Sequence, residues 1–221
     1  MHNIFVYGDS ITWGIVPDTR KRFAFDERWP GVLENQLRDS GKNVRIIEDS
    51  LNGRRTVWED PFKPGRNGRQ GLAQRIESHS PLSLVIVMLG TNDFQIAHSH
   101  NNAWAAAQGV AALVNEIRNA PIEPGMPAPP VLVVCPPPVG PPKGFIAAKF
   151  LGADERCHGL ADAYREVASG LGCDFFDAGS VTTSSRVDGI HLDADQHATL
   201  GRALASVVSP ILSEQATAAR T

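Results

Sequence analysis

A serine near the amino terminus is the first residue of this chain whose surroundings suggest chemistry. Ser10 follows a β-branched and aromatic run, Asn3 to Tyr7, which is typical of a strand buried on both faces. Gly8 then allows a tight turn, and Asp9 and Ser10 both favour the start of a helix. Ligands bind beside the carboxyl ends of strands in open parallel sheets, so the Ser10 hydroxyl could act there as a nucleophile. Taken alone, Ser10 is explained more simply as a helix cap.

A histidine near the other end of the chain could activate such a serine. Asp188 precedes His191 by three residues across a glycine, so its carboxylate can fold back onto the Nδ1–H of the ring. The Nε2 atom would then be free to accept a proton from a serine hydroxyl. A simpler alternative is that Asp188 or Asp193 caps the last helix and His191 lies on the surface.

Two further residues could stabilise the negative charge that develops during acyl transfer. Gly53 follows the second strand-like run and exposes its backbone N–H without a side chain to cover it. Asn92 follows the third run and offers an amide donor. In isolation, Gly53 would be only a turn residue and Asn92 only part of an Asx turn.

The four features form blocks that occur in a fixed order: Gly8-Asp9-Ser10, Gly53, Gly90-Thr91-Asn92-Asp93 and Asp188-Gly189-Ile190-His191. This pattern resembles the SGNH (GDSL-type) hydrolase family, and the resemblance covers nearly the whole chain. It implies a serine hydrolase with Ser10 as the nucleophile, His191 as the general base and acid, and Asp188 as the residue that orients His191. It also implies an oxyanion hole made by the backbone N–H groups of Ser10 and Gly53 and by the Asn92 side chain.

Several runs carry a narrower resemblance: residues 8–14, 85–93, 131–138 and 175–180. They are similar to the bacterial arylesterase and acyltransferase (perhydrolase) branch of the family. That likeness implies small acyl esters as substrates, acyl transfer to alcohols or hydrogen peroxide, and assembly into homo-oligomers, often octamers. Phe94-Gln95 departs from the Thr-Lys of well-known members, which bears on the shape of the pocket. A carbohydrate O-deacetylase shares the same blocks and stays an alternative.

The elements that must position these residues alternate along the chain. Strand-length apolar runs occupy residues 4–7, 44–48, 84–89, 131–135 and 173–176, and helix-like segments occupy residues 29–39, 71–78, 103–119, 154–169 and 194–213. This alternation predicts right-handed βαβ units and a three-layer α/β/α sandwich around a five-stranded parallel sheet. The family resemblance implies a flavodoxin-like strand order of 2-1-3-4-5. No repeat or linker divides residues 1–221, so we expect a single domain.

Two loops and an apolar segment follow predicted strands at the same edge as Ser10. The loops are Glu59–Gln70 and Pro136–Gly144, and the segment is Phe145–Leu151. We expect a lid or a subunit contact here rather than plain surface loops. Candidate substrate contacts are apolar residues beside the blocks or in the lid: Ile11, Trp13, Phe150, Ile190 and Leu192. Each of these could equally belong to the core.

The composition does not favour a nucleic-acid or membrane partner. The 221 residues carry a formal net charge of −3, and no apolar run is long enough to span a membrane. The chain start lacks a signal-peptide pattern, and the cysteines Cys135, Cys157 and Cys173 have no close pairing. We therefore expect a cytoplasmic protein whose partner is a small-molecule ester.

Other kinds of site have weaker support. His98-Ser99-His100 is a paired histidine motif without a carboxylate cluster to complete a metal site, so we expect no metal and no cofactor. The G-x-S-x-G, P-loop and G-x-G-x-x-G patterns do not occur. A non-catalytic flavodoxin-like module that holds a phosphate or nucleotide at the helix beginning near Ser10 stays an alternative from another class.

Overall fold

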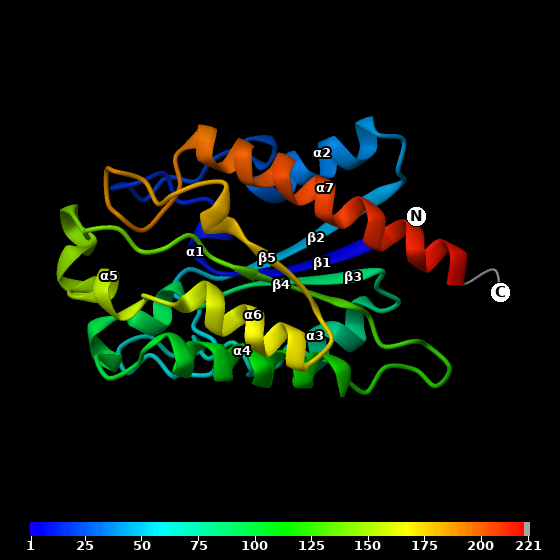
Figure 1. Ribbon diagram of the computed structural model, residues 1–221, viewed down its shortest axis with the longest axis horizontal. Coiled ribbons are helices and arrows are strands. Elements are labelled where there is room, and N and C mark those ends of the chain that lie inside the picture. The colour runs from blue at the N-terminus through cyan, green and yellow to red at the C-terminus, as the bar shows by residue number, and fades with distance from the viewer. Residues whose placement is uncertain (219–221) are drawn as a thin grey trace.

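A single parallel sheet organises the molecule, as seen in a computed structural model that describes residues 1–218 (Figure 1). Its strands are β1 (His2–Gly8), β2 (Val44–Ser50), β3 (Leu84–Met88), β4 (Val131–Cys135) and β5 (Asp174–Asp177). They lie in the order β2-β1-β3-β4-β5, and every neighbouring pair is parallel. The predicted order 2-1-3-4-5 is thus confirmed.

Helices cover both faces of this sheet and make the three predicted layers. One face carries α2 (Trp29–Asp39) and α7 (Ala194–Ala218), and the other carries α3 (Leu72–His79), α4 (Ala103–Arg118) and α6 (Leu160–Gly170) (Figure 1). Parallel strands need such crossover helices, since consecutive strands must run in the same direction.

Each face has its own apolar core because the strands are buried on both sides. On the α2 and α7 face, Leu200, Leu204 and Val208 of α7 pack with Ile4 and Val6 of β1. On the opposite face, the buried apolar residues of α4 pack with Phe5 of β1 and with alternate residues of β3 and β4. Alternate residues of one strand therefore enter different cores, which fixes the position of the β1 end where Ser10 follows.

One predicted helix is two helices in the structure. Residues 154–169 were expected to form a continuous helix, but α5 (Ala153–Arg156) and α6 are separate elements. Gly159 lies between them with a left-handed φ of 79°, a conformation that interrupts a right-handed helix. The last helix also continues beyond the expected Ser213, to Ala218.

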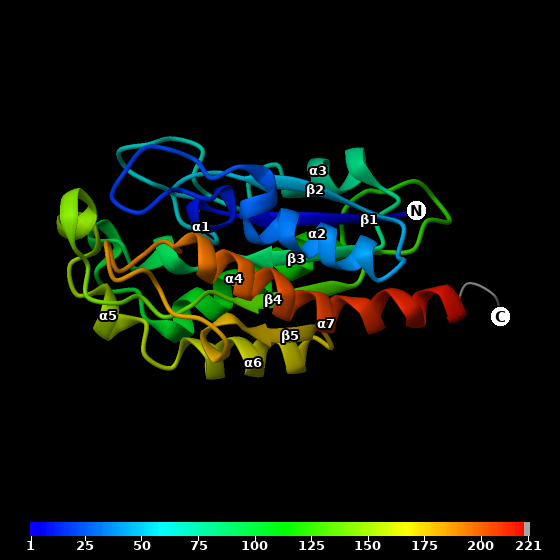
Figure 2. The same ribbon diagram turned by 90° about the horizontal axis from the view of Figure 1, so that it is seen from above.

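Several short helices complete the chain, most of them next to the strand ends. They are α1 (Ser10–Trp13) and the 3-10 helices η1 (Phe25–Glu27), η2 (Thr91–Phe94), η3 (Ile96–His98), η4 (Gly144–Phe150) and η5 (Ala178–Ser180). In the two views, α1 lies where β1 ends, and α5 lies beyond it, toward the end of the molecule opposite the amino terminus (Figures 1 and 2). Within residues 1–218, no helix combines the length and the apolar character needed to cross a membrane.

Candidate active site

Ser10 is the first residue of α1 and comes two residues after the last residue of β1. The N-cap of this helix is Asp9, whose Oδ1 accepts a hydrogen bond of 2.9 Å from the backbone N–H of Ile11. The interpretation of Ser10 as the helix cap is therefore wrong, because Asp9 caps the helix. The Ser10 hydroxyl is left to interact with residues from another part of the chain.

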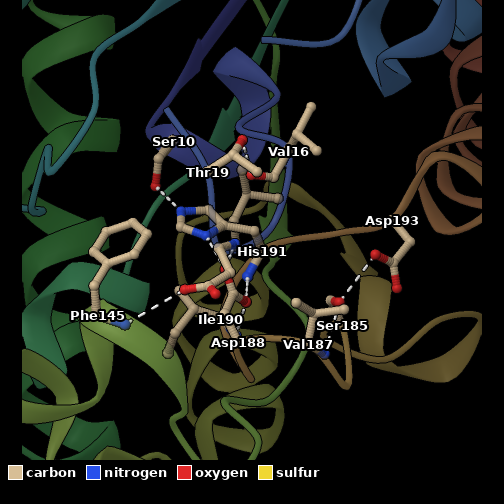
Figure 3. Close-up of polar contacts among 12 residues, drawn as sticks. Ser10, Val16, Thr19, Phe145, Ser185, Val187, Asp188, Ile190, His191 and Asp193 are labelled. Carbon is tan, nitrogen blue, oxygen red and sulfur yellow. Dashed lines mark hydrogen bonds and ion pairs between the residues drawn. The ribbon is translucent and has the colours of Figure 1, made fainter. Parts of the chain in front are cut away.

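The His191 ring lies between Ser10 and Asp188 (Figure 3). Its Nδ1 is 2.6 Å from Asp188 Oδ2, and its Nε2 is 3.1 Å from Ser10 Oγ. A carboxylate only accepts hydrogen bonds, so Nδ1 carries the proton and Nε2 accepts the Ser10 O–H. All three residues are buried, with Ser10 the most exposed at 6%. The structure thus joins residues that are 181 positions apart in the sequence.

A local turn holds Asp188 and His191 in this relation. Asp188 Oδ1 accepts hydrogen bonds of 2.9 Å from the backbone N–H groups of both Ile190 and His191. Gly189 has a φ of 78°, and a Cβ there would lie 2.4 Å from the carbonyl oxygen of Pro141. Only glycine fits this turn, because both its backbone conformation and its surroundings exclude a side chain.

The surroundings of Asp188 favour its charged form. Burial by itself would raise the pKa of Asp188, but the hydrogen bond and charge of His191, together with the two backbone N–H groups, lower that pKa to about 2. The backbone N–H of Asp18 adds a further contact of 3.3 Å to Oδ2. Asp188 is therefore a stable anion that can support positive charge on His191.

Gly53 lies in the loop that follows β2, with a positive φ of 84°. Its placement depends on Arg54, whose Nη1 donates to the carbonyl oxygens of Gly8 at 2.9 Å and of Asp49 at 2.7 Å. The Leu51 N–H also donates to the Gly8 carbonyl oxygen, at 3.1 Å. These bonds attach the Gly53 loop to the end of β1, directly before Ser10.

Asn92 lies in η2, which follows β3, and its side chain reaches the residue beside Ser10. Its Nδ2 donates a hydrogen bond of 2.8 Å to Asp9 Oδ2. Three adjacent strands, β2, β1 and β3, thus bring the three predicted oxyanion donors to one edge of the sheet. Their roles in binding an oxyanion stay predictions.

Buried polar residues around these donors had no predicted role. Asp9 and Asp93 are both carboxylates that burial affects strongly: it raises the pKa of Asp9 to about 6 and that of Asp93 to about 7. Asp93 accepts hydrogen bonds from the backbone N–H and the hydroxyl of Thr56. Arg55 and Gln95 are also buried at this edge. The sequence signals were the two arginines directly after Gly53 and the departure of Phe94-Gln95 from the family pattern.

The candidate substrate contacts have different surroundings. Ile11 and Leu192 lie in the core of the α2 and α7 face, while Phe150 and Ile190 lie in the opposite core. All four are at most 2% exposed, so they present little surface to a ligand in this structure. Trp13 is partly exposed, and the Arg22 guanidinium lies 4.6 Å from its ring centre. Direct contact of these residues with a substrate stays a prediction.

The titratable side chains of residues 1–218 form no metal site. Among residues 1–218, no group of three or more His, Cys, Asp or Glu side chains is placed to hold a metal ion. The site described above is instead a hydroxyl, an imidazole, a carboxylate and a set of N–H donors. This combination defines the class of α/β proteins that can perform nucleophilic acyl transfer from a serine.

Comparisons with known proteins agree with this class. The model of the GDSL-like Lipase/Acylhydrolase family matches residues 6–199. The inhibitor-bound aryl esterase of M. smegmatis has a TM-score of 0.90 and 38% sequence identity, covering 96% of this chain and 100% of that chain. A carbohydrate acetylesterase from Sinorhizobium meliloti has a TM-score of 0.89 and 34% identity, with the same coverage.

An arylesterase from Vibrio mimicus is 30% identical over 90 residues. That match spans 41% of this chain and 37% of the Vibrio protein, well under half the length of the curated relative. The family match, by contrast, extends over most of the chain. The protein belongs to the GDSL-like lipase/acylhydrolase (SGNH) family, as its four blocks predicted.

Proposed function

We propose that this protein is a serine esterase that cleaves small carboxylic esters, with short acyl or aryl groups, through an acyl-enzyme on Ser10. The observation that carries the proposal is the His191 ring, which contacts Ser10 Oγ at 3.1 Å and Asp188 Oδ2 at 2.6 Å. The family membership and the likeness to aryl esterases support it.

In the first half of the reaction, Ser10 Oγ attacks the ester carbonyl carbon. Its proton passes to His191 Nε2, and the anionic Asp188 stabilises the imidazolium that forms. The tetrahedral oxyanion is held by the N–H groups of Ser10 and Gly53 and by the Asn92 amide. One such donor contributes roughly 3 kcal/mol to lowering the barrier. His191 then protonates the leaving alcohol, which departs as the acyl-enzyme forms.

In the second half, a nucleophile releases the acyl group from Ser10. His191 removes a proton from water as the water attacks the acyl carbon. It then passes this proton to Ser10 Oγ as the bond between Oγ and the acyl carbon breaks, which regenerates the serine and releases a carboxylic acid. An alcohol or hydrogen peroxide in place of water would give a new ester or a peracid. Such transfer is part of the proposal because the acyl-enzyme is common to all three outcomes.

A second candidate function is carbohydrate O-deacetylation. Its support is the similarity of the chain to the carbohydrate acetylesterase from Sinorhizobium meliloti. The chemistry at Ser10 would be the same, and only the alcohol part of the ester would differ. Acetylated sugars and aryl acetates, compared at equal concentration, distinguish the two by their kcat/KM.

Association into a homo-oligomer is also proposed. Phe62 is 87% exposed and Leu151 is 66% exposed, and both lie in the segments expected to form a lid or a subunit contact. Exposed apolar side chains that gather into one patch mark contact sites, and a subunit contact would cover both of these side chains. Sedimentation velocity of the purified chain, with Phe62→Ser as the comparison, tests this assembly, and a monomer at all concentrations would contradict it.

The catalytic proposal is tested by labelling Ser10 and by measuring ester hydrolysis. A sulfonyl fluoride should modify one serine per chain, identified as Ser10 by peptide mass spectrometry, and abolish turnover of p-nitrophenyl acetate. Ser10→Ala should lose both reactions while folding normally, whereas Ser180→Ala, an exposed serine after β5, should keep both. A panel of p-nitrophenyl esters should show a steep fall in kcat/KM as the acyl chain lengthens. Retained esterase activity in Ser10→Ala, or tight nucleotide binding without labelling, would overturn the assignment.

A further inference from the structure

A continuous chain of buried polar side chains lies behind the oxyanion donors. Arg55 Nη2 donates to Gln95 Oε1 at 2.6 Å, and Gln95 Nε2 donates to Asn92 Oδ1 at 2.6 Å. Asn92 Nδ2 in turn donates to Asp9 Oδ2 at 2.8 Å. All four side chains belong to residues that are at most 3% exposed, so water does not compete for these bonds.

The direction of every bond in this chain follows from its two ends. Arg55 can only donate, so the oxygen of the Gln95 amide must face it and the nitrogen must face away. Gln95 therefore donates an N–H to Asn92, and the side-chain oxygen of Asn92 must accept it. The nitrogen of Asn92 is then turned toward Asp9, a carboxylate that accepts it. The donor at one end and the acceptor at the other impose the same orientation on both amides.

This orientation is the one that an oxyanion donor requires. Asn92 Nδ2 carries two N–H groups, one of which bonds to Asp9. The other makes no hydrogen bond within residues 1–218, so it is left to meet an oxyanion beside Ser10. If the amide were reversed, its oxygen would face the Asp9 carboxylate and the developing negative charge, and both contacts would be repulsive.

We propose that Gln95 is a positioning residue of the active site, which holds the Asn92 amide with its nitrogen toward Ser10 by linking it to the Arg55 guanidinium. This inference rests on the esterase function proposed above. Gln95 itself does not touch the substrate. It acts through Asn92, and a free Asn92 amide would lose part of its transition-state stabilisation by rotating.

Arg55, at one end of this row of hydrogen-bonded side chains, is itself held by several contacts. Arg55 Nη1 donates to the Glu59 carbonyl oxygen at 2.7 Å, and Nη2 lies 3.4 Å from Asp60 Oδ2. The Arg55 backbone N–H donates to the Arg66 carbonyl oxygen at 2.8 Å. The irregular Glu59–Gln70 loop thereby fixes a buried cation, which gives this loop a role in the site as well as any role at the surface.

Two substitutions separate the functions of Gln95. Gln95→Met keeps the length of the side chain but can bond to neither Arg55 nor Asn92. Gln95→Glu keeps an acceptor for Arg55 but has no donor for Asn92 Oδ1. We expect both variants to lower kcat for p-nitrophenyl acetate by about 10- to 100-fold with KM changed less than about threefold, because the lost interaction matters in the transition state. Gln108→Met, the same change on an exposed side chain of α4 outside the site, should leave both constants unchanged.

A double-mutant cycle with Asn92→Ala shows whether Gln95 acts through Asn92. In the Asn92→Ala background, Gln95→Met should lower kcat by less than about twofold, because the group it positions is gone. A loss that multiplies with that of Asn92→Ala would overturn the proposal, and so would wild-type kcat in Gln95→Glu. If Gln95→Met does not fold, by circular dichroism and thermal melting, Gln95→Glu completes the same cycle. Failure of the Ser10 experiments would instead reject the esterase itself, so the two outcomes are distinguishable.

Discussion

The proposed active site has an acid–base half and an oxyanion half, which are built in different ways. The acid–base half consists of Ser10, His191 and Asp188, and its carboxylate and imidazole are only three residues apart in the sequence. The oxyanion half depends on Asn92, which is held by Asp9, 83 residues away, and by Gln95. One half is therefore organised by a local turn and the other by contacts between loops that only the folded sheet brings together.

The two halves also treat buried carboxylates in opposite ways. Asp188 receives hydrogen bonds from the His191 ring and from backbone N–H groups, which lower its pKa to about 2 despite its burial. Asp9 receives hydrogen bonds from the N–H of Ile11 and the amide of Asn92, and burial raises its pKa to about 6. The balance between burial on one side and hydrogen bonds and the charge of His191 on the other thus sets the two pKa values apart.

Breaking the acid–base half should have the largest effect. Asp188→Asn keeps the shape of the turn but places an N–H₂ or an amide oxygen where an anion held the Nδ1–H of His191. The tautomer of His191 with its proton on Nδ1 is then no longer favoured, and no anion stabilises the positive charge of the ring. We therefore expect kcat to fall by about 10⁴-fold. Stopped-flow or extended assays with p-nitrophenyl acetate measure this loss.

Asp193→Asn is the matched control, because Asp193 is a carboxylate of the same loop that accepts a hydrogen bond from Ser185. This variant should change kcat less than about threefold. A similar loss in both variants would mean that the loop, rather than the charge on Asp188, matters.

Breaking the oxyanion half should have a smaller effect and a distinct signature. Asn92→Ala removes one donor of the proposed three, so we expect kcat to fall by about 10²- to 10³-fold while KM changes little. Ser10 should still react with a sulfonyl fluoride, although more slowly, because Ser10 and His191 keep their contact. An effect confined to KM would place Asn92 in ground-state binding and remove it from the oxyanion hole.

The same contrast explains what sequence patterns could predict. The strand order follows from five apolar runs and the family resemblance, and the Asp188-x-x-His191 turn is a local feature whose spacing can be interpreted directly. Gln95 and Arg55 gave no such signal, since their contact joins positions 40 residues apart through the ends of β2 and β3. The break at Gly159 was missed because an apolar stripe continues across it, although a glycine was present. The cap assigned to Ser10 was wrong by one residue, because Asp and Ser are both good caps and only the backbone distinguishes them.

Altering the electrostatics of the oxyanion half should affect the stability of the fold more than catalysis. Asp93 has a folded pKa of about 7 against an ordinary value of 3.8, so the folded protein keeps a proton that the unfolded chain releases between these values. Its contribution to the free energy of unfolding is therefore present below about pH 4 and is lost as the pH rises to about 7, by up to roughly 4 kcal/mol.

Asp93→Asn removes this titration while an amide can still bond to both groups of Thr56. The free energy of unfolding of the variant minus that of the wild type should therefore rise between pH 4 and pH 7, as measured by urea denaturation across that range. Asp162→Asn, which removes an exposed carboxylate from α6, controls for the loss of one negative charge and should show no such rise. Parallel curves for wild type and Asp93→Asn would mean that Asp93 is charged throughout this range. Asp93 would then be a firm anion like Asp188, and the electrostatic contrast between the two halves would rest on Asp9 alone.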